Sequence, residues 1–175
     1  MDEFWVFGYG SLMWNPGFAH VETAQAHLYG YRRALCIWSW VHRGTESDPG
    51  LVLGLSRGGS CKGVAFRVDP SEWGSVIAYL RERELVTNVY EEKVVALSLA
   101  DGRRVKGVTY VADPAHWQYA GSMRPSEAAK IVHRAQGKSG PNDAYLFNTL
   151  TQLRGMGIRD HLLEEVAREV ERLRA

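Results

Sequence analysis

Two groups of residues in this chain have the chemistry to bind and transform a small substrate. The first is a run that follows the aromatic and β-branched residues of a predicted buried strand, namely Gly8-Tyr9-Gly10-Ser11-Leu12-Met13. Glycines let the backbone turn sharply and let another group approach closely, because they carry no Cβ. Several backbone N–H groups of such a turn can point at one small anion. The alternative interpretation is a core strand that simply ends in a tight turn.

The second group centres on Glu84, near the end of a helix predicted over residues 70–85. At about 100° per residue, with Trp73 as zero, Glu84 falls at about 20°, in the same apolar stripe as Leu80. Its neighbour Glu82 falls at about 180°, on the face expected to meet water. The sequence therefore predicts that one of the two glutamates points toward the core.

A carboxylate that faces the core is destabilising unless it is paired or hydrogen-bonded. Burial raises the pKa of such a group, which is how a glutamate becomes a general base near neutral pH. The alternative is that the helix has frayed at this point, so that Glu84 points to solvent or pairs with an arginine.

These two groups resemble motifs of the ChaC-type γ-glutamylcyclotransferases. The run Gly8–Leu12, with a tryptophan at position 14, is similar to the opening motif of that family. Tyr79-Leu80 followed by Arg83-Glu84 is similar to the segment that carries the family's catalytic glutamate. The resemblance therefore implies that Glu84, and not Glu82, is the catalytic residue.

Two later segments extend the resemblance, which covers most of the chain. The run His42-Arg43-Gly44 matches a His-Arg-Gly element, and residues 142–146 resemble a late Asn-x-x-Tyr-Leu segment. Its tyrosine, Tyr145, is expected to contact the substrate, and the charge of Arg43 could attract a carboxylate of it. One departure lies at residues 85–89, which lack the glycine of some family members and would shape the leaving-group side of the site.

The resemblance implies that the chain cleaves glutathione to 5-oxoproline and cysteinylglycine by intramolecular aminolysis, a lyase reaction. Glu84 would be the general acid and base, and backbone N–H groups of Gly8–Met13 would hold the α-carboxylate or the developing oxyanion. Tyr9 and Ser11 would add hydroxyl contacts, so Ser11 would bind rather than attack. This chemistry requires no metal, nucleotide or other cofactor, and none is expected.

Two alternatives remain open at this point. The chain could act on another γ-glutamyl amine or peptide by the same chemistry. It could also be a non-catalytic regulatory protein on the same scaffold, since the ChaC name refers to a proposed link with cation transport. Retention of Glu84 argues against the loss of catalysis.

The elements that must position these residues are predicted to be strands first and helices last. Strands are expected over 26–40, over 51–55 and 63–68 as a pair joined near Gly58-Gly59, and over the hairpin 92–99 and 103–111. Helices are expected over 70–85, 126–136, 143–153 and 160–173. This order predicts one α+β domain over residues 1–175, with a curved or barrel-like sheet flanked by helices.

The composition excludes several other classes of protein. The 175 residues carry 21 basic and 20 acidic side chains with no basic block, so no nucleic-acid partner is expected. No apolar run reaches about 18 residues, so no membrane span and no membrane partner are expected. The start Met1-Asp2-Glu3 is acidic where a signal peptide is basic, so no secretory signal peptide is expected. The two cysteines, Cys36 and Cys61, make no disulfide framework, so a cytoplasmic location is expected. The six histidines show no ligand spacing, so no metal site is expected.

Overall fold

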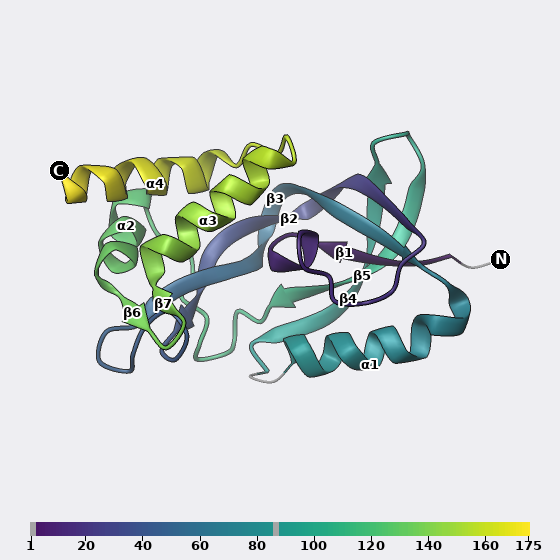
Figure 1. The fold of residues 1–175 in the computed structure, drawn as a ribbon, viewed down its shortest axis with the longest axis horizontal. Helices are drawn as coiled ribbons and strands as arrows, with labels where there is room; N and C mark the ends of the chain where they lie inside the picture. Colours follow the sequence, from purple (N-terminus) through teal and green to yellow (C-terminus); the bar gives the residue numbers. More distant parts are fainter. Residues whose placement is uncertain (1–2, 86–87) are drawn as a thin grey trace. The chain divides into compact units, whose positions relative to one another are not determined.

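The computed structural model describes residues 3–85 and 88–175, and Figure 1 shows its ribbon. The chain divides into two compact units. The first consists of Met1–Arg33 and Leu55–Asp113, and the second of Ala34–Gly54 and Pro114–Ala175. Residues 86 and 87, part of the segment expected to shape the leaving-group side, lie outside the described residues. The expectation of a single domain over the whole chain stays a prediction.

The first unit is built on a closed barrel with the strand order β1-β3-β2-β4-β5. The strands are β1 (Phe4–Gly8), β2 (Glu22–Ser39), β3 (Gly50–Val68), β4 (Tyr90–Leu99) and β5 (Arg104–Ala112). β1 pairs antiparallel with β3 and parallel with β5, which closes the barrel without leaving a free edge. The expected α+β class with a barrel-like sheet is therefore confirmed.

The predicted pair of strands over 51–55 and 63–68 is wrong, because β3 is one continuous strand. Gly58 and Gly59 have φ angles of +100° and +68°, a region that favours glycine. They bend the strand without reversing it. The side chain of Arg32 on β2 lies against both glycines and donates a hydrogen bond to the carbonyl of Arg57. Pairing along the sheet thus overrides a sequence signal that usually marks a turn.

The predicted helix over 70–85 forms as a short 3-10 turn, η2 (Pro70–Glu72), continued by α1 (Trp73–Glu84). The Asp69 carboxylate caps its start by accepting the Ser71 N–H at 2.9 Å. Val76 and Leu80 are buried against barrel residues, and α1 runs alongside the strands in Figure 1. The helix therefore presents a packed face to the barrel along its whole length.

The orientation predicted for the two glutamates of α1 is confirmed. Glu82 is exposed, whereas Glu84 is half-buried. The Leu85 N–H still donates to the Arg81 carbonyl at 2.9 Å, so the helical hydrogen bonding continues past Glu84. This bond excludes the frayed helix of the alternative interpretation, although Glu84 does pair with an arginine, Arg83.

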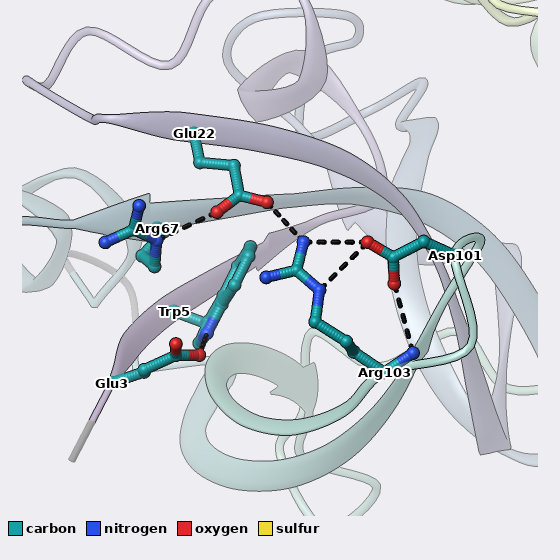
Figure 2. A network of polar contacts seen from close by, with 6 residues as sticks. All are labelled: Glu3, Trp5, Glu22, Arg67, Asp101 and Arg103. Carbon is teal, nitrogen blue, oxygen red and sulfur yellow. Dashed lines mark hydrogen bonds and ion pairs between the residues drawn. The ribbon is translucent and has the colours of Figure 1, made fainter. Parts of the chain in front are cut away.

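An ionic network ties the start of β1 to its neighbours in the barrel (Figure 2). Glu22 on β2 accepts from Arg67 on β3 at 2.9 Å and also pairs with Arg103. Arg103 in turn pairs with Asp101 at 2.9 Å and lies over the ring of Trp5. The hydrogen bonds from Arg103 and Arg67 hold the pKa of Glu22 below its usual value, and Arg103 does the same for Asp101.

The second unit contains α2 (Pro125–Arg134), α3 (Asn142–Gly155) and α4 (His161–Arg174), close to the predicted helices. The short strands β6 (Gln136–Gly137) and β7 (Gly140–Pro141) precede α3 and were not predicted. The buried amide of Asn142 accepts from the Leu51 N–H at 2.8 Å and donates to the Leu51 carbonyl at 2.9 Å. Within the described residues, no helix is both long and apolar enough to span a membrane.

Candidate active site

The predicted binding loop leaves the barrel at the end of β1 and forms the 3-10 turn η1 (Ser11–Met13). Leu12 and Met13 are buried, and Leu12 belongs to the cluster that packs under α1. A Cβ on Gly8 would lie 3.0 Å from the Leu12 Cβ and 3.3 Å from the Met13 nitrogen. This close approach explains why a glycine stands at the strand end.

The other loop residues differ in exposure. Tyr9 is buried, whereas Ser11 is exposed at the start of η1. The Met13 N–H donates to the Gly10 carbonyl at 2.9 Å, which closes the turn. The loop is thus anchored by apolar residues on one side and presents the Ser11 hydroxyl on the other.

Arg33 on β2 is a buried cation that holds the same loop, a role that the sequence reasoning missed. Its Nε donates to the Tyr9 carbonyl at 2.6 Å, and its Nη2 donates to the Lys62 carbonyl at 2.6 Å. The adjacent Phe7 carbonyl accepts from the Thr109 hydroxyl at 3.1 Å. The backbone leading into the loop is therefore fixed by buried hydrogen bonds.

Glu84 ends α1, and 18% of its side chain is exposed. The Arg83 Nε lies 3.6 Å from its Oε1, which is an ion pair without a close hydrogen bond. Burial raises the pKa of the Glu84 carboxyl above its ordinary value, and the charge of Arg83 opposes the rise without cancelling it. A raised pKa makes the Glu84 carboxylate a stronger base than an exposed glutamate, which suits a group that transfers protons.

Arg83 connects Glu84 to the binding loop, and the sequence expectations include it only as part of a motif. Its Nη2 donates to the Ser11 Oγ at 3.0 Å. Its Nη1 donates to the carbonyls of Asn15 at 2.8 Å and Pro16 at 3.2 Å. A signal was present in the sequence, since Arg83 falls at about −80° on the wheel, at the border of the apolar stripe.

Tyr110 on β5 is the second titratable group that faces Glu84. Its hydroxyl donates to the Glu92 Oε1 at 2.9 Å, and Arg81 holds both Glu92 oxygens at 3.0 Å. Burial, with the hydrogen bond to Glu92, raises the pKa of Tyr110, and the charge of Glu84 adds to the rise. Tyr110 therefore stays protonated and neutral beside Glu84.

The remaining predicted residues, Arg43 and Tyr145, lie in the second unit and contact each other. The Arg43 guanidinium is 5.5 Å from the centre of the Tyr145 ring, and its Nη1 donates to the Pro141 carbonyl at 3.2 Å. The Tyr145 hydroxyl accepts from the Leu53 N–H at 3.0 Å. The structure thus groups Glu84 with Gly8–Met13, and groups Arg43 with Tyr145.

Other features of the described residues do not add to this site. A cavity of about 310 Å³ beside the N-terminal half of α1 is lined by residues such as Phe4, Trp73 and Lys106, and none of the predicted site residues lines it. No cluster of three or more metal-ligating side chains occurs in ranges 3–85 and 88–175. What the first unit assembles is a half-buried carboxylate, a guanidinium and the loop that follows β1.

A family model and the similar known proteins agree on the family of this chain. A family model described as "ChaC-like protein" matches residues 4–173. A glutathione-specific γ-glutamylcyclotransferase of Escherichia coli is 36% identical over 171 residues, covering 98% of this chain and 74% of that protein. One from Schizosaccharomyces pombe is 31% identical, covering 97% of this chain and 95% of that protein.

A solved structure shows the same fold. The crystal structure of a γ-glutamylcyclotransferase specific to glutathione from yeast matches with a TM-score of 0.86 at 23% identity. The match covers 99% of this chain and 100% of the yeast chain. The family expected from Gly8–Leu12 and Glu84 is thereby confirmed, and this chain belongs to the ChaC-like family.

Proposed function

We propose that this chain is a glutathione-specific γ-glutamylcyclotransferase with Glu84 as its general base and acid. One observation carries the assignment of the residue: Glu84 is half-buried with a raised pKa, and Arg83 joins it to the loop that ends β1. The activity of the similar proteins supports the reaction.

The reaction needs a base and donors rather than a bound nucleophile. The α-amino group of the γ-glutamyl unit attacks its own γ-carbonyl, forming a C–N bond that closes a five-membered ring. The amide bond to cysteine then breaks. In total, two protons leave the attacking nitrogen and two reach the leaving nitrogen, so one carboxylate that moves protons between them is sufficient.

Each group in the first unit has a place in this scheme. Glu84 removes a proton from the α-ammonium, which frees the lone pair for attack, and returns it to the leaving nitrogen. Backbone N–H groups of the loop Gly8–Met13, other than that of Met13, which closes the turn, bind the α-carboxylate or the oxyanion of the tetrahedral intermediate. The Ser11 hydroxyl, held by Arg83, contributes a further polar contact. For Arg43, Tyr145 and the Tyr9 hydroxyl, contact with substrate stays a prediction from the resemblance.

The decisive experiment measures 5-oxoproline release from glutathione and from γ-glutamyl-alanine. The wild type is expected to act on glutathione, and Glu84→Gln is expected to lose the activity. Glu82→Gln is the matched control, because it removes an exposed carboxylate from the same helix. Its rate is expected to equal that of the wild type.

The possible results separate the alternatives. Release from γ-glutamyl-alanine alone would keep the chemistry and replace the substrate. Glutathione binding without any release would favour a regulatory protein. Full activity of Glu84→Gln would show that the base lies elsewhere.

We also propose that the enzyme works in the cytoplasm. The chain has two cysteines, Cys36 and Cys61, and both are buried, a cysteine content that suits a reducing compartment with a glutathione pool. Detecting the protein by cell fractionation tests this location, and recovery in a secreted fraction would contradict it.

A further inference from the structure

Resting on the function proposed above, we propose that Arg83 is a positioning residue. It holds the segment Ser11–Gly17, called the Ser11 loop below, against the end of α1, and it keeps one positive charge beside Glu84. It would thereby hold the base and the substrate-binding donors in a fixed relation. The Arg83 guanidinium makes several contacts with this loop, and the loop packs closely against α1.

The guanidinium of Arg83 reaches the loop at several points. Nη1 donates to the carbonyls of Asn15 and Pro16 at 2.8 and 3.2 Å and to the Tyr79 hydroxyl at 3.1 Å. Nη2 donates to the Ser11 hydroxyl at 3.0 Å. The planar guanidinium reaches these acceptors together, with one Nη1 hydrogen shared between two of them, whereas the compact ammonium of a lysine cannot reach them all from one point.

Packing at Gly17 shows independently that this segment rests on α1. A Cβ added to Gly17 would lie 2.2 Å from the Tyr79 hydroxyl oxygen, and Gly17 has a φ of +72°. Only a glycine tolerates both the contact and the conformation. Residues 15–17 are therefore pressed against the same face of α1 that Tyr79 and Arg83 present.

The position of the guanidinium also has an electrostatic consequence. Within the described ranges 3–85 and 88–175, Glu84 interacts electrostatically with Arg83 on its own helix and with Tyr110 on β5, and the Tyr110 hydroxyl is engaged by Glu92. Arg83 lowers the pKa of Glu84, while burial raises it. Removing the charge of Arg83 leaves burial unopposed, so the pKa of Glu84 rises further. A base must be ionised to act, so the acid limb of the activity then moves to higher pH.

The test compares pH profiles of kcat/KM for 5-oxoproline release from glutathione. Arg83→Gln removes charge and fork, and Arg83→Lys keeps the charge but not the fork. Arg104→Gln is the matched control, because Arg104 is an exposed arginine at the start of β5, six residues before Tyr110. Thermal melting of each variant is recorded alongside.

Different results are expected for each variant. Arg83→Gln moves the acid limb upward by about one pH unit and lowers kcat by about 10²-fold, because the base is both perturbed and displaced. Arg83→Lys keeps the acid limb close to that of the wild type, but still loses about tenfold or more in kcat. Arg104→Gln behaves as the wild type in rate and acid limb.

Several outcomes would overturn the inference. An unshifted acid limb in Arg83→Gln would show that the charge does not act on Glu84. A wild-type kcat in Arg83→Lys would show that the fork is not needed, and this variant decides alone if Arg83→Gln does not fold. An inactive wild type would refute the proposed function itself, a result separate from either of these.

Discussion

Glu22 and Glu84 lie beside opposite ends of β1, and each has arginine close to it. Glu22 is linked through Arg67 to the start of β1, where Arg67 pairs with Trp5 in the sheet. Glu84 lies beside the loop that follows the end of β1. The pKa of Glu22 is lowered and the pKa of Glu84 is raised. The same residue types therefore produce opposite effects in one barrel.

The difference comes from where the guanidinium groups are directed. Arg67 and Arg103 both hydrogen-bond directly to Glu22, whose side chain is 28% exposed. Arg83 directs both of its Nη atoms to the loop and leaves Glu84 an ion pair at 3.6 Å. Burial then outweighs the attraction at Glu84. Because Arg83 donates its hydrogen bonds to the loop, it does not cancel the rise in the pKa of Glu84, which stays a stronger base than Glu22.

The largest expected difference between the two glutamates is in catalysis. Glu84→Gln is expected to lower kcat/KM for glutathione by about 10²–10⁴-fold, the usual contribution of a general acid or base. Glu22→Gln is expected to leave kcat/KM within about twofold of the wild type, since a solvated network has little effect on distant chemistry. Steady-state kinetics of 5-oxoproline release measures both values of kcat/KM. Equal losses in the two variants would show that Glu84 has no special role in catalysis.

The second prediction concerns a substitution that should lower the pKa of Glu84, as the pKa of Glu22 is lowered. Gly17→Ala is expected to push the loop away from Tyr79, because its Cβ has no room there. Arg83 then loses its carbonyl partners and can hydrogen-bond to Glu84, which lowers the pKa of that carboxyl. We expect kcat to fall about tenfold and the acid limb to move to lower pH. A pH profile checks this, and a limb that moves upward would contradict it.

The smallest expected difference is in the pH dependence of stability. The folded state binds a proton at Glu84 more tightly than the unfolded chain does, so this contribution is full below about pH 4.5 and is lost as pH rises through the folded pKa. For Glu22 the sign is reversed, and its contribution is present above about pH 4.5 and lost as pH falls.

Melting temperatures across pH 4–8 test these signs. At pH 7, Glu84→Gln is expected to melt at the same temperature as the wild type or about 2–4 °C higher. Glu22→Gln is expected to melt slightly lower at pH 7, and its deficit is expected to shrink toward pH 4. A lower melting temperature for Glu84→Gln at neutral pH would show that the carboxylate is stabilised by its surroundings.

The sequence was sufficient for the features that depend on local pattern. The helical period alone placed Glu84 on the packed face and Glu82 in water, because α1 is long enough for its phase to be read. The hairpin over 92–99 and 103–111 was predictable because Asp101-Gly102 between its strands is a turn signal, and Gly102 has a φ of +94° in the structure.

Features that depend on distant pairing were not predictable. Arg83 reaches the carbonyl of Asn15, 68 residues earlier, and main-chain carbonyls carry no residue-specific signal. Arg33 likewise binds the carbonyl of Tyr9. Gly58-Gly59 indicated a turn, but strand pairing kept β3 continuous. In each case the decisive partner was a backbone group that every sequence possesses.

The path of β2 and β3 has a consequence for dissecting this protein. The boundary between the compact units falls after Arg33 in β2, after Gly54 in β3, and again after Asp113. No single cleavage of the chain therefore releases either unit whole. A fragment that ends at Asp113 retains residues 34–54 without the helices that belong with them. Truncation and limited proteolysis would thus act on both units together.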